Sequence, residues 1–125
     1  MKKLKVLPMS LREKKRYVGF KVIHEKGEDF AHEDLIAAVW NTLLDFYGEY
    51  GVSNLSFQIV KNVWYEKKKM GVIRCKHTEV PKVIAGLGLI SRLGDTKVTI
   101  KILKVSGTLK KVKEKLAIEA KRKDY

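Results

Sequence analysis

Hydrophobic and polar positions alternate most clearly at residues 97–105, which read KVTIKILKV. Val98, Ile100 and Ile102 fall on one face of an extended chain, and Lys or Thr occupies the positions between them. This two-residue period predicts a strand with one buried face. A strongly basic segment follows this strand directly, so the buried strand would hold that segment in a fixed position.

That basic segment begins with a turn and cap motif formed by Ser106, Gly107 and Thr108. Glycine permits a tight bend, and a Ser or Thr hydroxyl can cap the first N–H groups of a helix. From Leu109 onward, apolar residues recur at helical spacing and lysines fill most other positions. We therefore predict a basic C-terminal helix at about 108–123, held in place by the preceding core strand.

The same reading divides the rest of the chain into alternating and helical patterns. It predicts strands at 17–24, 55–65, 70–76 and from about 96, and helices at about 31–50 and 79–93. The order β-α-β-β-α-β indicates an α+β, ferredoxin-like (RRM-like) two-layer sandwich with an extra C-terminal helix. Both crossover helices should cover one face of a four-stranded antiparallel sheet, and the other face stays open unless the last helix or a partner covers it. We expect one domain at 16–125 after a flexible basic arm at 1–15.

Charge is distributed unevenly along the 125 residues, whose net charge is +13. Residues 1–16 hold seven Lys/Arg and one acid (+6), and residues 97–125 hold ten and three (+7). The middle, 17–96, holds ten of each and sums to zero. A lysine-rich surface that only aids solubility usually carries balancing glutamates. The two basic ends therefore favour a nucleic-acid partner, with a solvated surface as the alternative.

Compartment and catalytic chemistry are constrained by what the sequence lacks. Cys75 is the single cysteine and permits no internal disulfide, no apolar run reaches the length of a membrane helix, and the N-terminus does not resemble a signal peptide. We expect a cytoplasmic protein.

Cys75 and His77 could supply two metal ligands, but a closed zinc site needs about four. Gly86 and Gly88 lie in an apolar helical pattern and indicate close helix packing. We therefore assign neither catalytic residues nor a metal site to this sequence.

Candidate binding residues follow from the charge and from the predicted faces. RNA-recognition modules stack bases on aromatic residues of their third strand, and here that strand reads MGVIRCK, without an aromatic. The open face instead mixes cations with apolar residues, which fits an RNA backbone or a protein partner. The predicted RNA-binding residues are Arg12, Lys14, Lys15, Arg16, Arg74, Lys76, Lys101, Lys110, Lys111 and Lys113. The predicted protein interface contains Ile23, Phe46, Val72 and Leu103.

Three segments together resemble the ribonuclease P protein component 2 family. They are LPMSLREKKRY near the N-terminus, GVIRC at 71–75 and VSGTLKKVK at 105–113. The resemblance extends from about Leu7 to Leu116, and the Ser-Gly-Thr motif followed by basic residues is its most specific part. Met9 stands where a second proline is expected, and Gly86 and Gly88 stand where alanines are usual.

The resemblance implies a noncatalytic RNA-binding subunit of ribonuclease P, which removes the 5′ leader from precursor tRNA. The RNA is then the catalyst and uses magnesium, and the protein itself binds no cofactor. The implied partners are the ribonuclease P RNA, precursor tRNA and a TIM-barrel-like subunit, component 3, in a two-plus-two assembly. The alternatives are another RNA-binding ferredoxin-like protein of a ribonucleoprotein, a small-molecule regulatory module, or a small phosphatase. The sequence shows no phosphate-cradling loop for the last of these.

Overall fold

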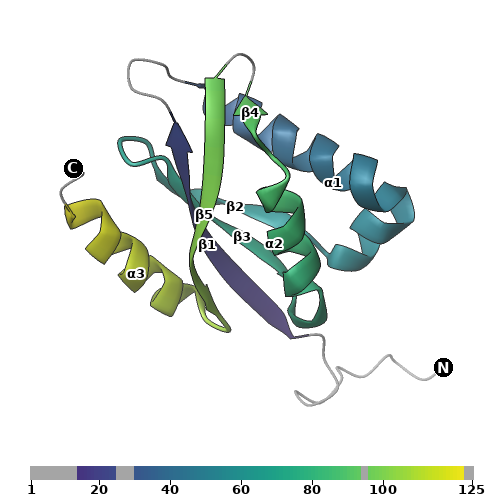
Figure 1. Ribbon diagram of the computed structural model, residues 1–125. Coiled ribbons are helices and arrows are strands. Elements are labelled where there is room, and N and C mark those ends of the chain that lie inside the picture. The colour runs from purple at the N-terminus through teal and green to yellow at the C-terminus, as the bar shows by residue number, and fades with distance from the viewer. Residues whose placement is uncertain (1–13, 25–29, 94–95, 123–125) are drawn as a thin grey trace, which may run out of the picture.

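The computed structural model describes residues 14–24, 30–93 and 96–122. The elements follow one another as β1 (Lys15–His24), α1 (His32–Leu55), β2 (Gln58–Tyr65), β3 (Met70–Lys76), a short 3₁₀ helix (His77–Glu79), α2 (Val80–Gly88), β4 (Arg92–Leu93), β5 (Thr96–Ser106) and α3 (Leu109–Lys121) (Figure 1). Apart from the short β4, this is the β-α-β-β-α-β order with a C-terminal helix that the sequence predicts. None of the helices in the described ranges combines the length and apolar character needed to cross a membrane.

The strands form one curled sheet in the order β2-β3-β1-β5-β4. Every described pairing is antiparallel, and β1 lies at the centre between β3 and β5. The four long strands thus take the ferredoxin-like order, which confirms the predicted fold class. The short β4 extends the sheet beyond β5, so the sheet has five strands rather than the predicted four.

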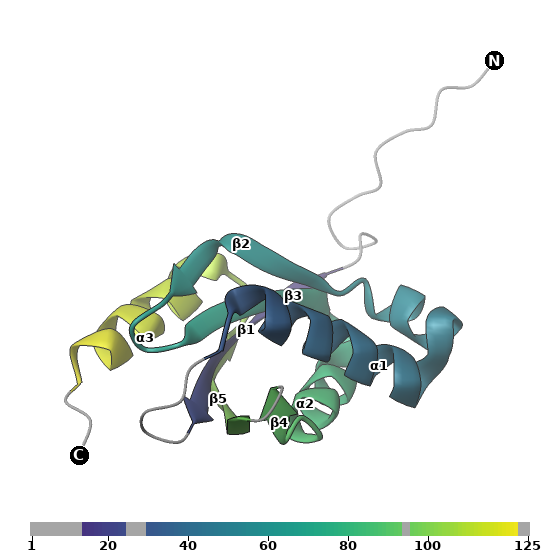
Figure 2. The same ribbon diagram turned by 90° about the horizontal axis from the view of Figure 1, so that it is seen from above.

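The two faces of the sheet are covered by different helices. Figures 1 and 2 show α1 and α2 on one face and α3 on the other. The main core lies on the side of α1 and α2, where Val18, Phe20 and Val22 of β1 are almost completely buried. These three residues alternate along the strand, as a sheet face requires. The sequence pattern therefore predicts the main core correctly.

A second, smaller core lies beneath α3. It contains Val63, Met70, Val72, Val112 and Leu116, of which the last two belong to α3. The helix lies close to the sheet because Gly19 of β1 has no side chain. A Cβ at this position would lie only 2.7 Å from Cγ1 of Val112. The C-terminal helix is thus packed onto the otherwise open face of the sheet.

The first helix is longer than its sequence predicts. Gly48 has the non-helical angles φ 73° and ψ 174°, but the helix resumes beyond it and continues to Leu55. Val52 and Leu55 are buried, so apolar contacts hold the segment beyond the kink in a helical conformation. The expectation that this helix ends at about residue 50 is therefore wrong.

The second helix is shorter than predicted and ends at Gly88 rather than near residue 93. Arg92 and Leu93 instead pair with Lys97 and Thr96 of β5, and Leu93 is buried in the main core. The predicted close helix packing is confirmed at Gly86, where a Cβ would lie 2.5 Å from Cδ2 of Leu43 in α1. Gly88 has no neighbour within 4 Å of such a Cβ and plays no such role.

Candidate nucleic-acid interface

The two basic ends of the chain come together in the folded protein. Because β1 and β5 are antiparallel, Tyr17 at the start of β1 lies opposite Ser106 at the end of β5. The preceding residue, Arg16, lies beside the turn, and a Cβ on Gly107 would be 3.4 Å from the Arg16 Nη1. Residues separated by about ninety positions therefore contribute cations to one end of the sheet. Arg12, also predicted to bind RNA, lies outside the described residues.

The cations at this end come from the start of β1 and the end of β3. Lys14 is exposed, and Lys15 and Arg16 are half-buried at the start of β1. Lys76 at the end of β3 lies directly opposite Lys15 in the sheet register. Two cations at facing positions add to the positive potential of this region, which favours an anion.

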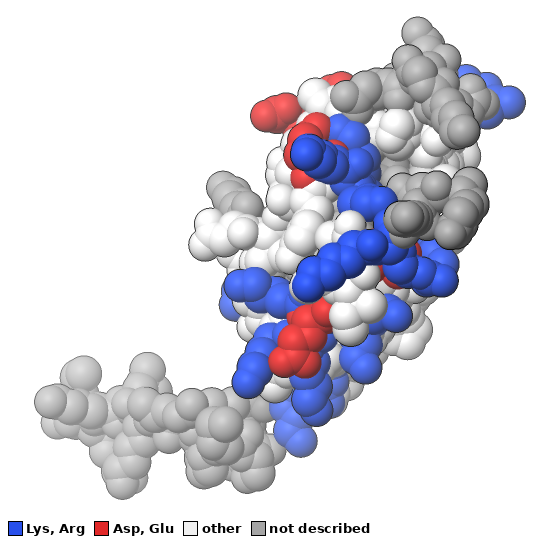
Figure 3. All heavy atoms as spheres, turned by 90° about the vertical axis from the view of Figure 1, so that its left-hand side faces the viewer, with Lys and Arg blue, Asp and Glu red and all other residues white. Residues whose placement is uncertain are grey.

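Helix α3 presents its lysines to the outside. Val112 and Leu116 are completely buried against the sheet, whereas Lys110, Lys111 and Lys113 are exposed. Figure 3 shows this side of the molecule, where Lys and Arg side chains gather and few acidic ones interrupt them. The amphipathic pattern thus fixes one face of α3 and leaves a row of cations on the other.

The Ser-Gly-Thr turn leads into α3, as the sequence predicts, but its hydroxyls are used differently. Thr108 occupies the N-cap position without a side-chain capping hydrogen bond. Its backbone N–H donates instead to the Ser106 Oγ at 3.3 Å. The first turn of α3 contains no acidic residue, so its N-terminal dipole charge adds to that of the lysines. The start of α3 is therefore strongly electropositive.

The sheet face beside α3 carries further cations. Lys101 is exposed and lies opposite Lys21, whose Nζ is 3.9 Å from a carboxylate oxygen of Glu119 in α3. Arg74 of β3 donates a hydrogen bond to the side-chain oxygen of Gln58 in the adjoining β2. The cations predicted from sequence within the described residues thus lie on β1, β3, β5 and α3, and those of β3 and β5 flank the helix.

Helix α3 changes the predicted protein interface. Val72 is completely buried beneath it and offers no surface to a partner, so the expectation that it lies exposed is wrong. Leu103 is half-buried against the same small core. Ile23 is 48% exposed near the far end of β1. The sequence predicts the correct face for these residues but not which of them the helix covers.

The largest exposed apolar side chains outside the sheet lie mainly on α1. Phe46 is 61% exposed and Tyr50 is 82% exposed, and Trp40 and Leu44 are each more than one-third exposed. Phe46 follows Val39 by seven residues and so falls on the stripe that is buried earlier in the helix. The helix thus extends its apolar stripe beyond the surface that the sheet and α2 cover.

Cys75 has the properties of a core residue. Its side chain is completely buried, and burial raises the pKa of its thiol from 9.0 to about 11, an effect that nearby Lys15 opposes. A neutral thiol is a poor nucleophile and a poor metal ligand. The neighbouring His77 is exposed, and the part of the chain that the structure describes has no cluster of three or more His, Cys, Asp or Glu residues suited to a metal ion.

Comparison with known proteins shows which family has this sequence. The sequence model of the Rpp14/Pop5 family matches residues 16–117. The chain belongs to this family. Ribonuclease P protein component 2 of Pyrococcus furiosus is 40% identical over 111 residues, which are 89% of either chain. The protein of the same name from Methanocaldococcus jannaschii is 36% identical and covers 90% of this chain and 79% of its own length.

A solved structure agrees with the fold. One chain in the cryo-EM structure of yeast ribonuclease MRP matches with a TM-score of 0.60 and 16% identity, covering 88% of this chain and 96% of that one. The region matched by the Rpp14/Pop5 model includes the Ser-Gly-Thr turn and most of α3. The basic helix is thus part of the family's common region rather than an added tail.

Two charged residues of this Rpp14/Pop5 protein escape the sequence analysis. Lys104 would face the main core by strict alternation, but a register shift in β1–β5 places it opposite Gly19, on the side of α3. Glu119 is buried at the end of α3, where it lies 3.4 Å from Arg122 as well as near Lys21. A bulge leaves no clear sequence signal. Glu119, by contrast, follows Val112 by seven residues and so could be placed on the buried stripe.

Proposed function

We propose that this Rpp14/Pop5 protein is the protein component 2 of ribonuclease P, an RNA-binding subunit that supports a catalytic RNA. Its relatives of that name are 27–40% identical over most of the chain, and this similarity carries the proposal. The surface described above gives it a physical basis. Cations from both basic ends meet at one end of a sheet, where they can neutralise several phosphates.

In this proposal the protein positions RNA and does not itself cut it. Lys110, Lys111 and Lys113 contact phosphates from the rigid outer face of α3, and Lys14, Lys15 and Arg16 contact them from the start of β1. Phosphate contacts fix orientation without reading sequence, which suits a subunit that stabilises a folded RNA. Magnesium serves the RNA, whose cleavage of the 5′ leader of precursor tRNA takes place in the cytoplasm.

The proposed protein partner is the TIM-barrel-like subunit, component 3, in a two-plus-two assembly. The apolar side chains that α1 leaves exposed support such a contact, because groups of this kind often mark interaction sites. The region 17–96, which includes α1, carries no net charge. A largely apolar contact through α1 would leave the basic surface around α3 available to RNA.

Reconstitution tests this function. The cognate RNA is combined with the other protein subunits, with and without this chain, and cleavage of precursor tRNA is followed at limiting magnesium. We expect the complete mixture to remove the 5′ leader faster than the mixture lacking this chain. The purified chain alone, with magnesium and precursor tRNA, should give no cleavage. Equal rates with and without it, or leader removal by the RNA-free chain, would contradict the proposal.

A further inference from the structure

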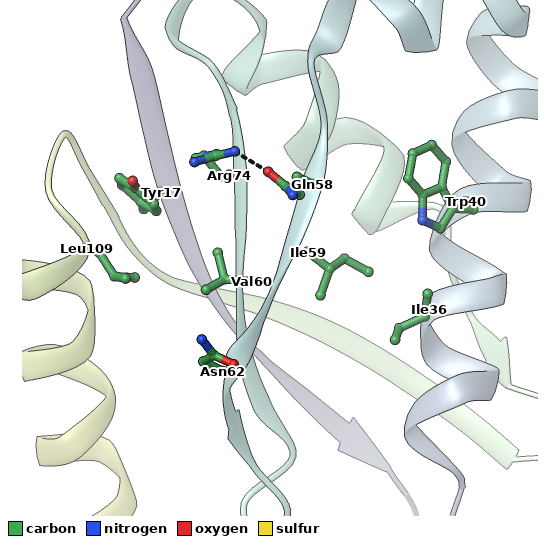
Figure 4. Close-up of a pocket in the computed structure, with 9 residues that line it drawn as sticks. All are labelled: Tyr17, Ile36, Trp40, Gln58, Ile59, Val60, Asn62, Arg74 and Leu109. Carbon is green, nitrogen blue, oxygen red and sulfur yellow. Dashed lines mark hydrogen bonds between the residues drawn. The ribbon is translucent and has the colours of Figure 1, made fainter.

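A trough runs between α3 and the edge strand β2. Two hollows border it, and Leu109 at the start of α3 lines both. The first, of about 760 Å³, also reaches Ile36 and Trp40 of α1 beyond β2, and the second is about 540 Å³. Figure 4 shows the first hollow, where Tyr17, Arg74, Val60 and Asn62 lie between β2 and the helix, while Trp40 and Ile36 of α1 lie on the other side of β2. Lys110 and Lys113 of the outward-facing lysine row of α3 also line the second hollow, so the trough adjoins that row.

Two tyrosines lie along this trough on the same face of the sheet. Tyr17 of β1 is opposite Arg74, and Tyr65 of β2 is opposite Met70. Arg74 and Met70 are four residues apart on β3, so they share a face and are separated by about 13 Å along the strand. Both tyrosines are half-buried, so part of each side chain remains accessible. A segment of a few nucleotides spans this distance, since stacked bases follow one another at about 3.4 Å per strand.

The polar groups that line the first hollow suit the edges of unpaired bases. Gln58 and Asn62 present exposed amides, which both donate and accept hydrogen bonds. The Arg74 guanidinium is held by its hydrogen bond to Gln58, and its buried Nε makes no hydrogen bond to any described residue. The hydrogen bond to Gln58 fixes the guanidinium on the wall of the first hollow.

The charge around the trough selects the class of ligand. Lys110 and Lys113 line its second hollow together with a single acid, Glu114, and Arg74 lines its first hollow. An extended peptide would pair with the free edge of β2 and needs apolar pockets for alternate side chains. The walls here include apolar residues such as Val60 and Leu109, but tyrosines, amides and cations lie beside them. Aromatic faces beside cations are the usual means of binding single-stranded nucleic acid.

We infer that this trough binds a short, unpaired segment of RNA, with one base stacked on Tyr17, another on Tyr65, and the intervening phosphates contacted by Lys110 and Lys113. The inference rests on the proposed function, since it assigns a site within an RNA-binding subunit. It adds recognition of unpaired bases to the phosphate contacts proposed for the basic ends.

The test measures binding of the full chain to a fluorescein-labelled eight-nucleotide oligouridine and to an RNA hairpin with a fully paired stem. Tyr17→Leu and Tyr65→Leu remove the aromatic ring and keep apolar bulk. Each should weaken oligouridine binding about ten-fold, the usual effect of losing one stacked base, and should change hairpin binding less than two-fold. Tyr17→Phe retains a ring and should bind oligouridine within two-fold of the wild type. Tyr50→Leu, on the remote surface of α1, is the matched control and should bind normally.

Further readouts separate this site from general effects. Thermal unfolding followed by circular dichroism should show that the leucine variants are folded at the assay temperature. If a leucine variant does not fold, a second experiment on the wild type takes its place. Oligomers of 5-iodouridine are cross-linked to the wild-type protein, and mass spectrometry should identify cross-linked peptides that contain Tyr17 or Tyr65. Normal oligouridine binding by both leucine variants, or cross-links confined to other surfaces, would overturn the inference. So would variants that bind RNA normally but lose the protein partner.

The two proposals fail in different ways. If the wild type binds neither RNA and has no effect in reconstitution, the proposed function is wrong. If the wild type binds both RNAs and supports cleavage, while both leucine variants keep their affinity for oligouridine, only the site assignment in the trough is wrong.

Discussion

Gly19 is the residue that lets α3 lie against the sheet. A Cβ at this position would meet Cγ1 of Val112 at 2.7 Å and Cδ2 of Leu116 at 3.4 Å, and both side chains are completely buried. Gly19→Ala should therefore overpack the small core and lower the free energy of unfolding by about 1–3 kcal/mol. Chemical denaturation monitored by circular dichroism measures this change.

Gly88→Ala provides the matched control for that substitution. Gly88 is the last residue of α2, and no atom lies within 4 Å of the Cβ that would be added. Alanine is the better helix former, so this variant should be unchanged or more stable by up to about 1 kcal/mol. If Gly19→Ala were as stable as Gly88→Ala, α3 would not be packed on β1 as the structure has it.

Individual residues also show where sequence reasoning stops. Alternation places Val72 on the α3 face correctly, but it cannot show that a helix more than thirty residues later covers it. The same applies to Tyr17 and Tyr65. The third strand lacks aromatics, which argues against base stacking on it, but β1 and β2 bring tyrosines to the trough beside that strand. Such groupings depend on register and on helix packing, which single-residue patterns do not specify.

At the scale of elements, the exposed lysines of α3 predict how the affinity for RNA depends on salt concentration. Affinity falls with salt, and each phosphate contact on a duplex contributes about −0.9 to the slope of log affinity against log salt concentration. Changing Lys110, Lys111 and Lys113 together to Ala should make this negative slope shallower by up to about 2.7, because all three are exposed on the helix. Fluorescence titration of the cognate RNA at several salt concentrations measures the slope.

Lys82→Ala is the control for the lysine variants. Lys82 is also exposed on a helix, α2, which lies on the opposite face of the sheet, and it pairs with Glu79 at 3.0 Å. Its removal should leave the salt slope unchanged. A triple variant with the wild-type slope would exclude the outer face of α3 from the RNA interface.

The elements themselves were predictable to different degrees. β3 and the start of α3 follow from strict periodicity and clear turn residues, and the structure confirms both. The ends of α1 and α2 do not follow, because tertiary contacts decide them. Burial of Val52 and Leu55 continues α1 beyond its kink, and burial of Leu93 draws the chain after α2 into β4. Local glycine signals are weaker than these apolar contacts.

At the scale of the whole molecule, topology explains why charge at the two ends of the sequence forms one surface. Antiparallel pairing of the first and last strands brings the start of β1 to the end of β5, and α3 then folds back over the sheet. The β-α-β-β-α-β order is enough to predict that pairing. The sequence therefore indicates both the fold and the general location of the cations. The trough between α3 and β2 needs the actual placement of the helix.

The whole molecule also leaves apolar surface for a protein partner away from its cations. Phe46 on α1 is 61% exposed, and residues 17–96 carry no net charge, so the proposed complex with component 3 should rest on apolar contact. Size-exclusion chromatography with light scattering of the mixed proteins tests this at about 0.5 M salt, where exposed charge pairs are strongly screened. The wild-type complex should persist at that salt, and Phe46→Asp should weaken it because a buried, unpaired carboxylate is costly. Lys14→Ala should leave it intact. A complex that dissolves at high salt, or one that tolerates Phe46→Asp, would mean that the basic surface or another face of the molecule binds the partner.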